Sequence, residues 1–186
     1  MLITVSITCF SYDLPRGWYV AGTQPDKYDM GIVVGAGQNG KNAATIQSVA
    51  KKIKGFGTLM QDSRPDKFLG KRVRMSGDMK SSDVRGWAGL WMRVDECGGS
   101  SPLSFDNMQD RKIAGNTEWK RYEIVLDVPN EASNIAFGAL LDGTGQVWFE
   151  NITFEIVTAV VPTTGYSSPD SWMQSEPSNL NFEEKY

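Results

Sequence analysis

Two apolar stretches near the end of the chain decide the fold class: IAFGALL at residues 135–141 and QVWFENITFEIV at residues 146–157, separated by DGTG at residues 142–145. β-Branched and aromatic residues are frequent in both stretches, and the intervening glycines suit a tight turn. Two strands joined in this way are typical of a β-sandwich or barrel. We therefore predict that the two stretches pair as a β-hairpin that closes a β-sandwich.

Strand-like segments recur along the rest of the chain, separated by turn residues and without an amphipathic helical segment. The predicted strands are residues 18–21, 31–34, 43–49, 56–61, 72–80, 86–95 and 121–128. Between the second and third of these, Asn39 and Gly40 form an Asn-Gly pair that favours a tight hairpin turn. In the fifth, Val73, Met75 and Met79 alternate with polar residues and are expected to face the core. The predicted fold class is all-β, a two-sheet antiparallel β-sandwich of the jelly-roll type.

The chain has 186 residues, which suits one domain. We expect residues 1–161 to form a β-sandwich binding domain. Residues 162–186 are rich in Ser, Pro, Asn and Glu, and such a segment buries too little apolar area to offset the entropy lost on ordering. It is predicted to be a polar tail, either flexible or docked on the sandwich through residues such as Trp172.

Charge and histidine content exclude several classes of function. The formal net charge is −3 and no dense run of Lys or Arg occurs, whereas nucleic-acid-binding proteins normally show a basic face. Lys51, Lys52 and Lys54 form a small cluster that is typical of a solvated loop. The chain has no histidine, which excludes a Ser-His-Asp triad and a His-bearing zinc site. We expect no nucleic-acid partner.

The sequence near the start of the chain is informative about cellular localisation. Residues 2–10 are largely apolar but lack the basic start and small-residue cleavage site of a signal peptide, so we expect a strand there. No stretch approaches the roughly 20 apolar residues needed to cross a bilayer. A soluble, cytoplasmic protein without a membrane partner is therefore expected. Cys9 and Cys97 are too few for a metal cage and are expected to be free thiols, although the sequence leaves their pairing open.

The strand predicted at residues 86–95 has two unlike faces. One is apolar, with Ala88, Leu90, Met92 and Val94, and the other carries Trp87, Gly89, Trp91, Arg93 and Asp95. An indole can stack on the apolar face of a sugar ring while Arg and Asp hydrogen-bond the hydroxyls, so the second face predicts a carbohydrate site. The alternative is that a loop or the tail covers both tryptophans and that Arg93 and Asp95 form an ordinary ion pair.

Two polar groups are candidates for the same site. The first group comprises Gln61, Arg74 and Asp78. It would complete a concave groove if its strands shared a sheet face with the tryptophans, and would otherwise be solvated surface. The second group comprises Asp106, Asn107 and Gln109. As loop residues these could reach over the groove edge, or simply cap a turn.

Glu150 and Asn151 interrupt the apolar alternation between Phe149 and Ile152, which predicts a β-bulge. Their side-chain oxygens are weak candidates for the ligands of a structural calcium ion, the only cofactor considered for this chain. A bulge can also form without a metal. The Asn151–Thr153 sequence matches a glycosylation site but lies inside a predicted strand, and is interpreted as accidental.

Several short motifs occur in a familiar order: Gly17-Trp18, ATIQS at 44–48, LGKRVRMS at 69–76 followed by Lys80, EWKRY at 118–122 and GQVWFENI at 145–152. In this order they resemble the galactose-binding-like jelly-rolls, especially carbohydrate-binding modules of the family 4/9 type. The resemblance covers roughly residues 17–157. It implies a ligand site on a concave face or at loop ends and a structural calcium. Similar segments resemble the accessory domain of some bacterial transcriptional regulators, although no helix-turn-helix is predicted here.

The preferred interpretation is a non-catalytic binding module whose ligand is a carbohydrate or another small polar molecule. The alternative is a protein-interaction or ligand-sensing regulatory domain, in which the aromatic face binds a protein partner and the tail controls access. A glycosidase or lyase is the third interpretation. It would require two carboxylates facing each other across a groove, for example Asp78 with Asp95 or Glu150.

Overall fold

The computed structural model describes residues 12–167. The strand expected at residues 2–10, Cys9 and Trp172 lie outside the described residues, so the predictions for them stay predictions. Cys97 is exposed. No helix within residues 12–167 is long and apolar enough to cross a membrane.

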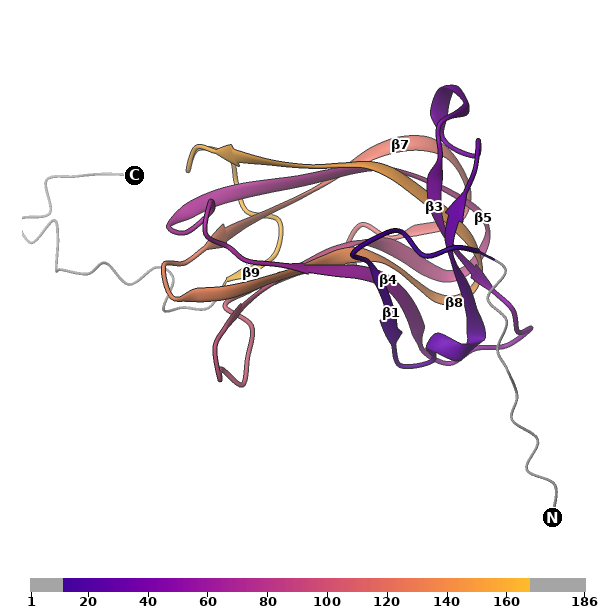
Figure 1. The fold of residues 1–186 in the computed structure, drawn as a ribbon, viewed down its shortest axis with the longest axis horizontal. Coiled ribbons are helices and arrows are strands. Elements are labelled where there is room, and N and C mark those ends of the chain that lie inside the picture. The colour runs from indigo at the N-terminus through magenta and orange to yellow at the C-terminus, as the bar shows by residue number, and fades with distance from the viewer. Residues whose placement is uncertain (1–11, 168–186) are drawn as a thin grey trace, which may run out of the picture.

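The described chain is almost entirely β-structure, so the predicted fold class is confirmed (Figure 1). Its strands are β1 (Tyr19–Gly22), β2 (Tyr28–Val33), β3 (Ala43–Ser48), β4 (Phe56–Ser63), β5 (Lys71–Glu96), β6 (Ser104–Asp106), β7 (Ile113–Val128), β8 (Ala132–Val157) and β9 (Tyr166–Ser167). The only helical elements of this region are two single 3-10 turns, Pro25–Lys27 and Gln38–Gly40.

Strands β5 and β8 pair antiparallel along their whole length and bend together, which creates the two layers seen in Figure 1. In the first sheet, the early half of β5 and the late half of β8 are flanked by β7 on one side and by β3 and β2 on the other. In the second sheet, the late half of β5 and the early half of β8 belong to the strand order β1-β4-β8-β5-β6-β9. Strands β5 and β8 thus each contribute one half to each sheet.

The predicted hairpin at residues 135–157 is wrong. The two apolar stretches are halves of one strand, β8, and both pair with β5 instead of with each other. Glycines at the bend adopt positive φ angles, 131° at Gly86 and 88° at Gly143, and Gly86 lies opposite Gly143. A Cβ atom on either glycine would lie 2.2 Å from a carbonyl oxygen of the other strand. The glycines therefore bend two paired strands here and do not reverse the chain.

The same bend joins the strands predicted at residues 72–80 and 86–95 into the single strand β5. The hairpin predicted around Asn39 and Gly40 is confirmed, because β2 pairs antiparallel with β3 and the two residues have φ angles of 56° and 72°. The Asn-Gly pair lies in a 3-10 turn within a connection longer than a two-residue turn.

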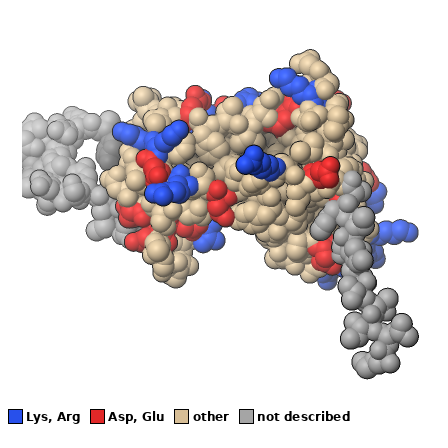
Figure 2. Space-filling model, viewed as in Figure 1, with Lys and Arg blue, Asp and Glu red and all other residues tan. Residues whose placement is uncertain are grey.

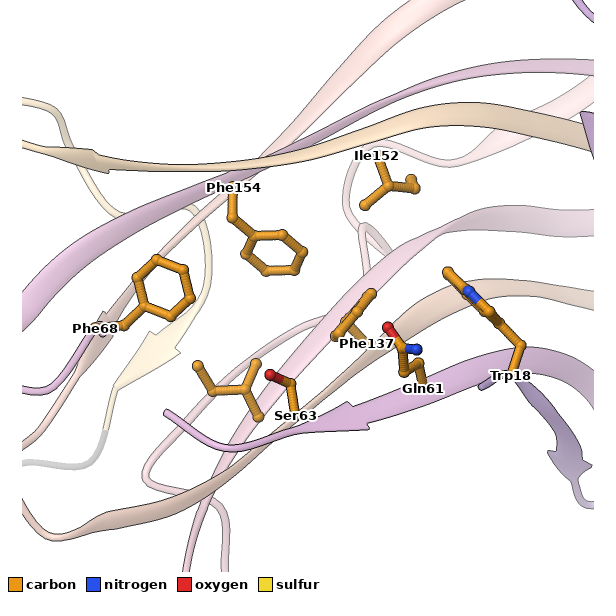
Figure 3. Close-up of a pocket in the computed structure, with 8 residues that line it drawn as sticks. Trp18, Gln61, Ser63, Phe68, Phe137, Ile152 and Phe154 are labelled. Carbon is orange, nitrogen blue, oxygen red and sulfur yellow. The ribbon is translucent and has the colours of Figure 1, made fainter. Parts of the chain in front are cut away.

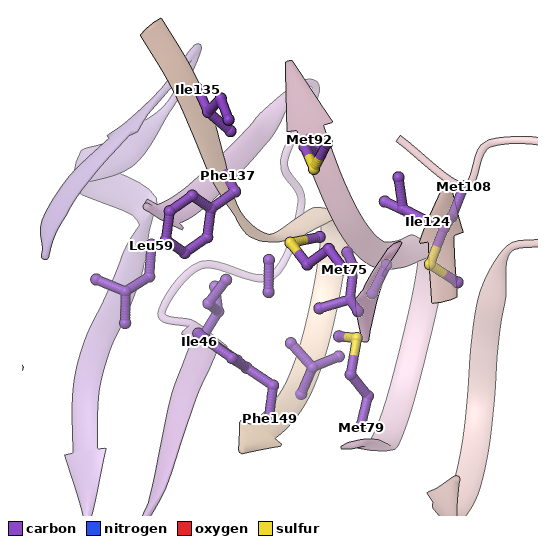
Figure 4. Close-up of a cluster of buried hydrophobic side chains, with 14 of the residues drawn as sticks. Ile46, Leu59, Met75, Met79, Met92, Met108, Ile124, Ile135, Phe137 and Phe149 are labelled. Carbon is purple, nitrogen blue, oxygen red and sulfur yellow. The ribbon is translucent and has the colours of Figure 1, made fainter. Parts of the chain in front are cut away.

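The hydrophobic core fills the space between the two sheets (Figure 4). Val73, Met75 and Met79 are completely buried, as predicted. They pack with inward-facing side chains of the second sheet, among them Leu59, Leu90, Met92 and Phe137. Side chains on the opposite side of each strand point away from this core, so each sheet also presents an outer face.

Tyr28 is expected to make stability depend on pH in the alkaline range. Its side chain is buried and its hydroxyl donates a hydrogen bond to the carbonyl of Gly143 at 2.8 Å. Burial, aided by the charge of Asp142, raises the pKa of Tyr28 from 10.0 to about 12. Because the pKa is higher in the folded state, the stabilisation is complete below pH 10 and is lost between pH 10 and about 12.

Denaturant unfolding measured across this pH window should therefore show a falling free energy of unfolding. The variant Tyr28→Phe should show a smaller fall, the remainder arising from Tyr19, whose pKa burial also raises to about 12. A variant whose pH profile parallels that of the wild type would contradict the role assigned to Tyr28.

Candidate functional site

The outer face of the second sheet carries the residues that the sequence singled out. The alternation predicted in residues 86–95 is confirmed: Ala88, Leu90, Met92 and Val94 are completely buried in the core. Trp87, Trp91, Arg93 and Asp95 consequently share the outer face, and all four line one hollow. A segment with strict two-residue alternation places every second side chain on the same side of the sheet.

We call this depression the tryptophan hollow. It has a volume of about 510 Å³, within the usual range for small-molecule sites. Its walls and floor come from β1, β4, β5, β6, β8 and the start of the loop after β6: Ala21, Gly22, Phe56, Thr58, Met60, Asp62, Trp87, Trp91, Arg93, Asp95, Phe105, Asn107, Asn134, Ala136 and Leu140.

The floor of the hollow is a small apolar cluster separate from the main core. Trp91, Ala136 and Leu140 are its buried members, and Trp87 and Phe105 pack against them. The Trp91 indole Nε1 donates a hydrogen bond to Thr58 Oγ1 on β4 at 2.8 Å. This bond reaches across β8, which pairs with β5 on one side and with β4 on the other. Trp91 is thus fixed in the floor, whereas Trp87 is only partly buried.

The rim of the hollow carries charged and polar groups. Arg93 Nε donates to Asp95 Oδ1 at 2.7 Å, and the Arg93 side chain is 44% exposed. Across the hollow, Asp62 accepts hydrogen bonds from the Tyr19 hydroxyl and from Asn134 Nδ2. Burial and the neighbouring Asp62 raise the pKa of Tyr19 to about 12, so this hydroxyl remains a donor near neutral pH.

The predicted loop group is only partly in place. Asn107 lines the hollow. Asp106 does not: its buried carboxylate pairs with Arg111 at 2.6 Å and accepts the backbone N–H of Met108. Gln109 is exposed, and its backbone N–H bonds to Asn107 Oδ1. The capped-turn interpretation therefore describes Asp106 and Gln109 better than a role at the groove edge.

Arg74 and Asp78 are not near the tryptophans, so this part of the predicted groove is wrong. Both belong to the early half of β5, in the first sheet. Arg74 pairs there with Glu155 at 2.9 Å, and Asp78 pairs with Arg121 at 3.2 Å. The bend in β5 assigns the two halves of this strand to different sheets, which the alternation pattern alone does not reveal.

Gln61 is also displaced from the predicted groove. It lines a second cavity of about 340 Å³ at the open side between the sheets (Figure 3). Four aromatic rings surround this cavity, those of Trp18, Phe68, Phe137 and Phe154. The Phe137 and Phe154 rings meet edge to face with centroids 4.8 Å apart. We call this second cavity the inter-sheet cavity. Its four aromatic rings lie at the edge of the main core.

Sequence reasoning missed most of the floor of the hollow. Phe56 and Met60 on β4, Phe105 on β6 and Leu140 on β8 contribute its apolar surface. Alternation is visible within β4 and β8, and β6 is too short to show a pattern, but the assignment of a face depends on which strands are neighbours. That information is not local.

Glu150 occupies the predicted bulge. Ser76 lies opposite Thr153 and Asp78 opposite Glu150, so β8 has one extra residue here, and Asn151 has a φ angle of 53°. Glu150 Oε2 is buried without a hydrogen-bond partner among the described residues. A Cβ atom built on Gly37 would lie 2.0 Å from this oxygen and within 3.0 Å of the carbonyls of Lys41 and Asn42.

Carboxylate and carbonyl oxygens are the ligands that calcium prefers, although the point that these three oxygens surround lies against the Gly37 Cα and the Lys41 carbonyl already accepts the Gly37 N–H at 2.8 Å. Asn151 fits less well, because its amide nitrogen faces Glu150 and Asp78 as a donor. No cluster of three or more acidic, Cys or His side chains that could hold a metal occurs within residues 12–167. Any ion at Glu150 would therefore depend largely on backbone carbonyls and water.

The charged side chains of the described residues form no single patch on the face that Figure 2 shows, where basic and acidic side chains are interspersed. On the outer face of the first sheet, the Lys80 ammonium lies over the rings of Trp119 and Trp148, at 5.2 and 4.7 Å from their centroids. These two tryptophans are thus already engaged by a cation within the chain.

Comparison of the sequence with known proteins identifies a relative in Bacillus subtilis. No family model matches the chain. It is 42% identical over 171 residues to YbfP of Bacillus subtilis (strain 168), described as an uncharacterized HTH-type transcriptional regulator. The match covers 91% of this chain and 57% of YbfP, so the chain spans little more than half the length of this relative.

Among solved structures, the xylan-binding domain CBM22-1 of Paenibacillus barcinonensis Xyn10C is 12% identical, with a TM-score of 0.55, over 81% of this chain and 92% of that domain. The Stig cyclase Fisc from Fischerella sp. TAU is 14% identical, with a TM-score of 0.57, over 82% and 90%. The chain therefore has the β-sandwich fold of carbohydrate-binding modules, a fold that an enzyme also uses.

Proposed function

We propose that this chain is a non-catalytic binding module that binds carbohydrate in the tryptophan hollow. The observation that carries the proposal is the juxtaposition of a partly exposed indole, Trp87, with a rim of hydrogen-bonding groups around an apolar floor. A sugar ring has an apolar face that stacks on aromatic rings and a polar edge that needs hydrogen-bond partners. Arg93 and Asn107 offer donors, and Asp62 and Asp95 offer acceptors.

A binding role is favoured because donors of the chain hold each rim carboxylate in place while lone pairs remain to accept from a sugar hydroxyl. Asp95 accepts from Arg93, and Asp62 accepts from Tyr19 and Asn134. Hydrolysis of a glycosidic bond needs one carboxylic acid and one carboxylate facing the scissile bond. We also propose that the module is of the family 4/9 type, because its sequence motifs resemble those of that family.

The experiment is a titration of the wild-type protein with soluble xylan, β-glucan and galactan oligosaccharides, followed by tryptophan fluorescence and calorimetry. A saturable response to at least one sugar is expected. A flat response to the whole panel would overturn the proposal.

We further propose that Glu150, with the carbonyls of Lys41 and Asn42, holds a structural calcium ion. A ligand that binds only the folded state stabilises it, by about 2.7 kcal/mol at a concentration 100 times Kd. Calcium should therefore raise the melting temperature of the wild type by several degrees relative to chelator. Glu150→Gln should abolish this rise, while Glu155→Gln, which alters a carboxylate of the same strand that is 56% exposed, should retain it. Equal melting temperatures of the wild type with calcium and with chelator would contradict the site.

The relationship to YbfP favours a second candidate, a ligand-sensing domain of a regulator. In that case the same hollow would bind the effector. The titration panel would then be extended to non-saccharide metabolites, and a response restricted to these would favour the second candidate over the first.

A further inference from the structure

We infer that the binding face extends across the whole second sheet to Tyr166, and that its ligand is an oligosaccharide chain lying across the strands instead of a single sugar. This inference rests on the proposed carbohydrate-binding function. It assigns ligand contacts to two exposed tyrosines, Tyr19 at one edge of the sheet and Tyr166 at the other.

The strand register places Tyr166 on the same face as the hollow. Ala136 lies opposite Arg93, Arg93 opposite Phe105, and Phe105 opposite Tyr166. Directly opposed residues on antiparallel strands point to the same side of the sheet, about 5 Å apart. Since Arg93 and Phe105 line the hollow, Tyr166 continues the row beyond it.

Tyr19 occupies the matching position at the other edge. It lies opposite Met60, and Met60 lies opposite Gly138, which in turn lies opposite Trp91. The side chain of Tyr19 is therefore on the outer face, at the β1 edge of the row that contains Trp91. Tyr19 and Tyr166 are both exposed large side chains, at 41% and 55%.

The two tyrosines thus flank the hollow at opposite edges of the sheet. From β1 to β9 the strand order includes five spacings, or about 24 Å at roughly 4.8 Å each. A single sugar ring cannot reach from one edge to the other. A chain of sugars can stack on Tyr19, on the tryptophans and on Phe105 and Tyr166 in turn, with the Arg93 guanidinium between the tryptophans' strand edge and Phe105, which it faces.

Tyr166 is held in place by the segment that precedes it. The Thr164 hydroxyl donates to Asp106 Oδ2 at 2.5 Å and its backbone N–H bonds to the carbonyl of Val125 at 2.9 Å. Arg72 Nη1 bonds to the carbonyls of Ala159 and Val161. A Cβ atom on Gly165 would lie 2.3 Å from the carbonyl oxygen of Phe105, so this glycine permits the close approach to β6.

The position of Tyr166 also gives residues 162–167 a function. The segment leaves the first sheet at the end of β8, contacts β7 through Thr164 and joins the second sheet as β9. It thereby delivers an aromatic ring to the edge of the binding face.

The test compares chain lengths. Affinities of xylohexaose and xylobiose, and of cellohexaose and cellobiose, are measured by calorimetry for the wild type, Tyr166→Ala and Tyr166→Phe. The wild type should bind the hexaose of the preferred sugar at least about tenfold more tightly than the biose. Tyr166→Ala should weaken hexaose binding about tenfold, about 1.4 kcal/mol, and leave biose binding unchanged. Tyr166→Phe should behave as the wild type, because the ring is retained.

Equal wild-type affinity for the two lengths, or an equal loss for both in Tyr166→Ala, would overturn the inference while leaving the proposed function intact, provided that Trp87→Ala still loses binding. Absence of wild-type binding to every sugar would overturn both. Because Tyr166 is exposed, unchanged melting temperatures should accompany the affinity changes.

Discussion

Replacing Asp106 by alanine is expected to lower the free energy of unfolding by about 3 kcal/mol, since the buried Met108 N–H, the Thr164 hydroxyl and the Arg111 guanidinium all lose a hydrogen-bond acceptor. The Asp106 carboxylate is 4% exposed and accepts from Arg111, from the Met108 backbone and from Thr164. It therefore ties β6, the following loop and the segment before β9 together. Loss of all these bonds at once explains why the expected effect is large.

The measurement is urea unfolding of the wild type, Asp106→Ala and Asp110→Ala. Asp110 is the matched control, because it also pairs with Arg111, at 2.8 Å, but its side chain is 74% exposed. An exposed ion pair contributes less than about 1 kcal/mol. Similar losses of unfolding free energy in the two variants would show that burial of Asp106 adds no stability, and would contradict this prediction.

Replacing Trp87 by alanine is expected to reduce saccharide affinity by at least about tenfold, or 1.4 kcal/mol. Aromatic side chains at the centre of a binding site commonly contribute about 2 kcal/mol or more when truncated. Trp87 is the better target than Trp91. Trp91 is buried and bonded to Thr58, and truncating a buried Trp costs about 3–5 kcal/mol of stability, so loss of binding by that variant would be ambiguous.

The matched control is Trp119→Ala. Trp119 is also a partly buried tryptophan, but it lies in β7 and packs against Lys80, away from the hollow. Calorimetry should show wild-type affinity for this variant and a clear loss for Trp87→Ala. Equal losses, or no loss in either variant, would remove the tryptophan hollow from consideration as the sugar site.

The part of the site that the sequence predicted correctly is local. In residues 86–95 the alternation of large apolar and polar side chains places Trp87, Trp91, Arg93 and Asp95 together whatever the neighbouring strands are. The core positions Val73, Met75 and Met79 were predictable for the same reason. Two-residue periodicity carries this information within a single strand.

The predicted hairpin is wrong because glycines with positive φ angles occur both where a chain reverses and where a strand bends. The DGTG sequence at residues 142–145 has the composition of a turn, but it bends β8 while β5 bends beside it at Gly86. Positive φ angles serve both purposes, so the local sequence does not distinguish a reversal from a bend. For the same reason, the sequence leaves open which sheet Arg74 and Asp78 belong to.

The contribution of β4, β6 and β9 to the hollow depends on long-range pairing. Phe105 reaches the site because β6 is the neighbour of β5, and Tyr166 because β9 is the neighbour of β6. Strands β6 and β9 are also short, with three and two residues. Segments of this length give no usable periodicity.

The most direct test of the central claim is a nuclear magnetic resonance titration that follows the indole N–H signals of the six tryptophans in the chain. On addition of the hexaose that the panel identifies, the signals of Trp87 and Trp91 should shift and saturate together, while those of Trp119 and Trp148 stay unchanged. Shifts confined to Trp18 of the inter-sheet cavity, or to Trp119 and Trp148, would contradict the assignment of the tryptophan hollow as the binding site.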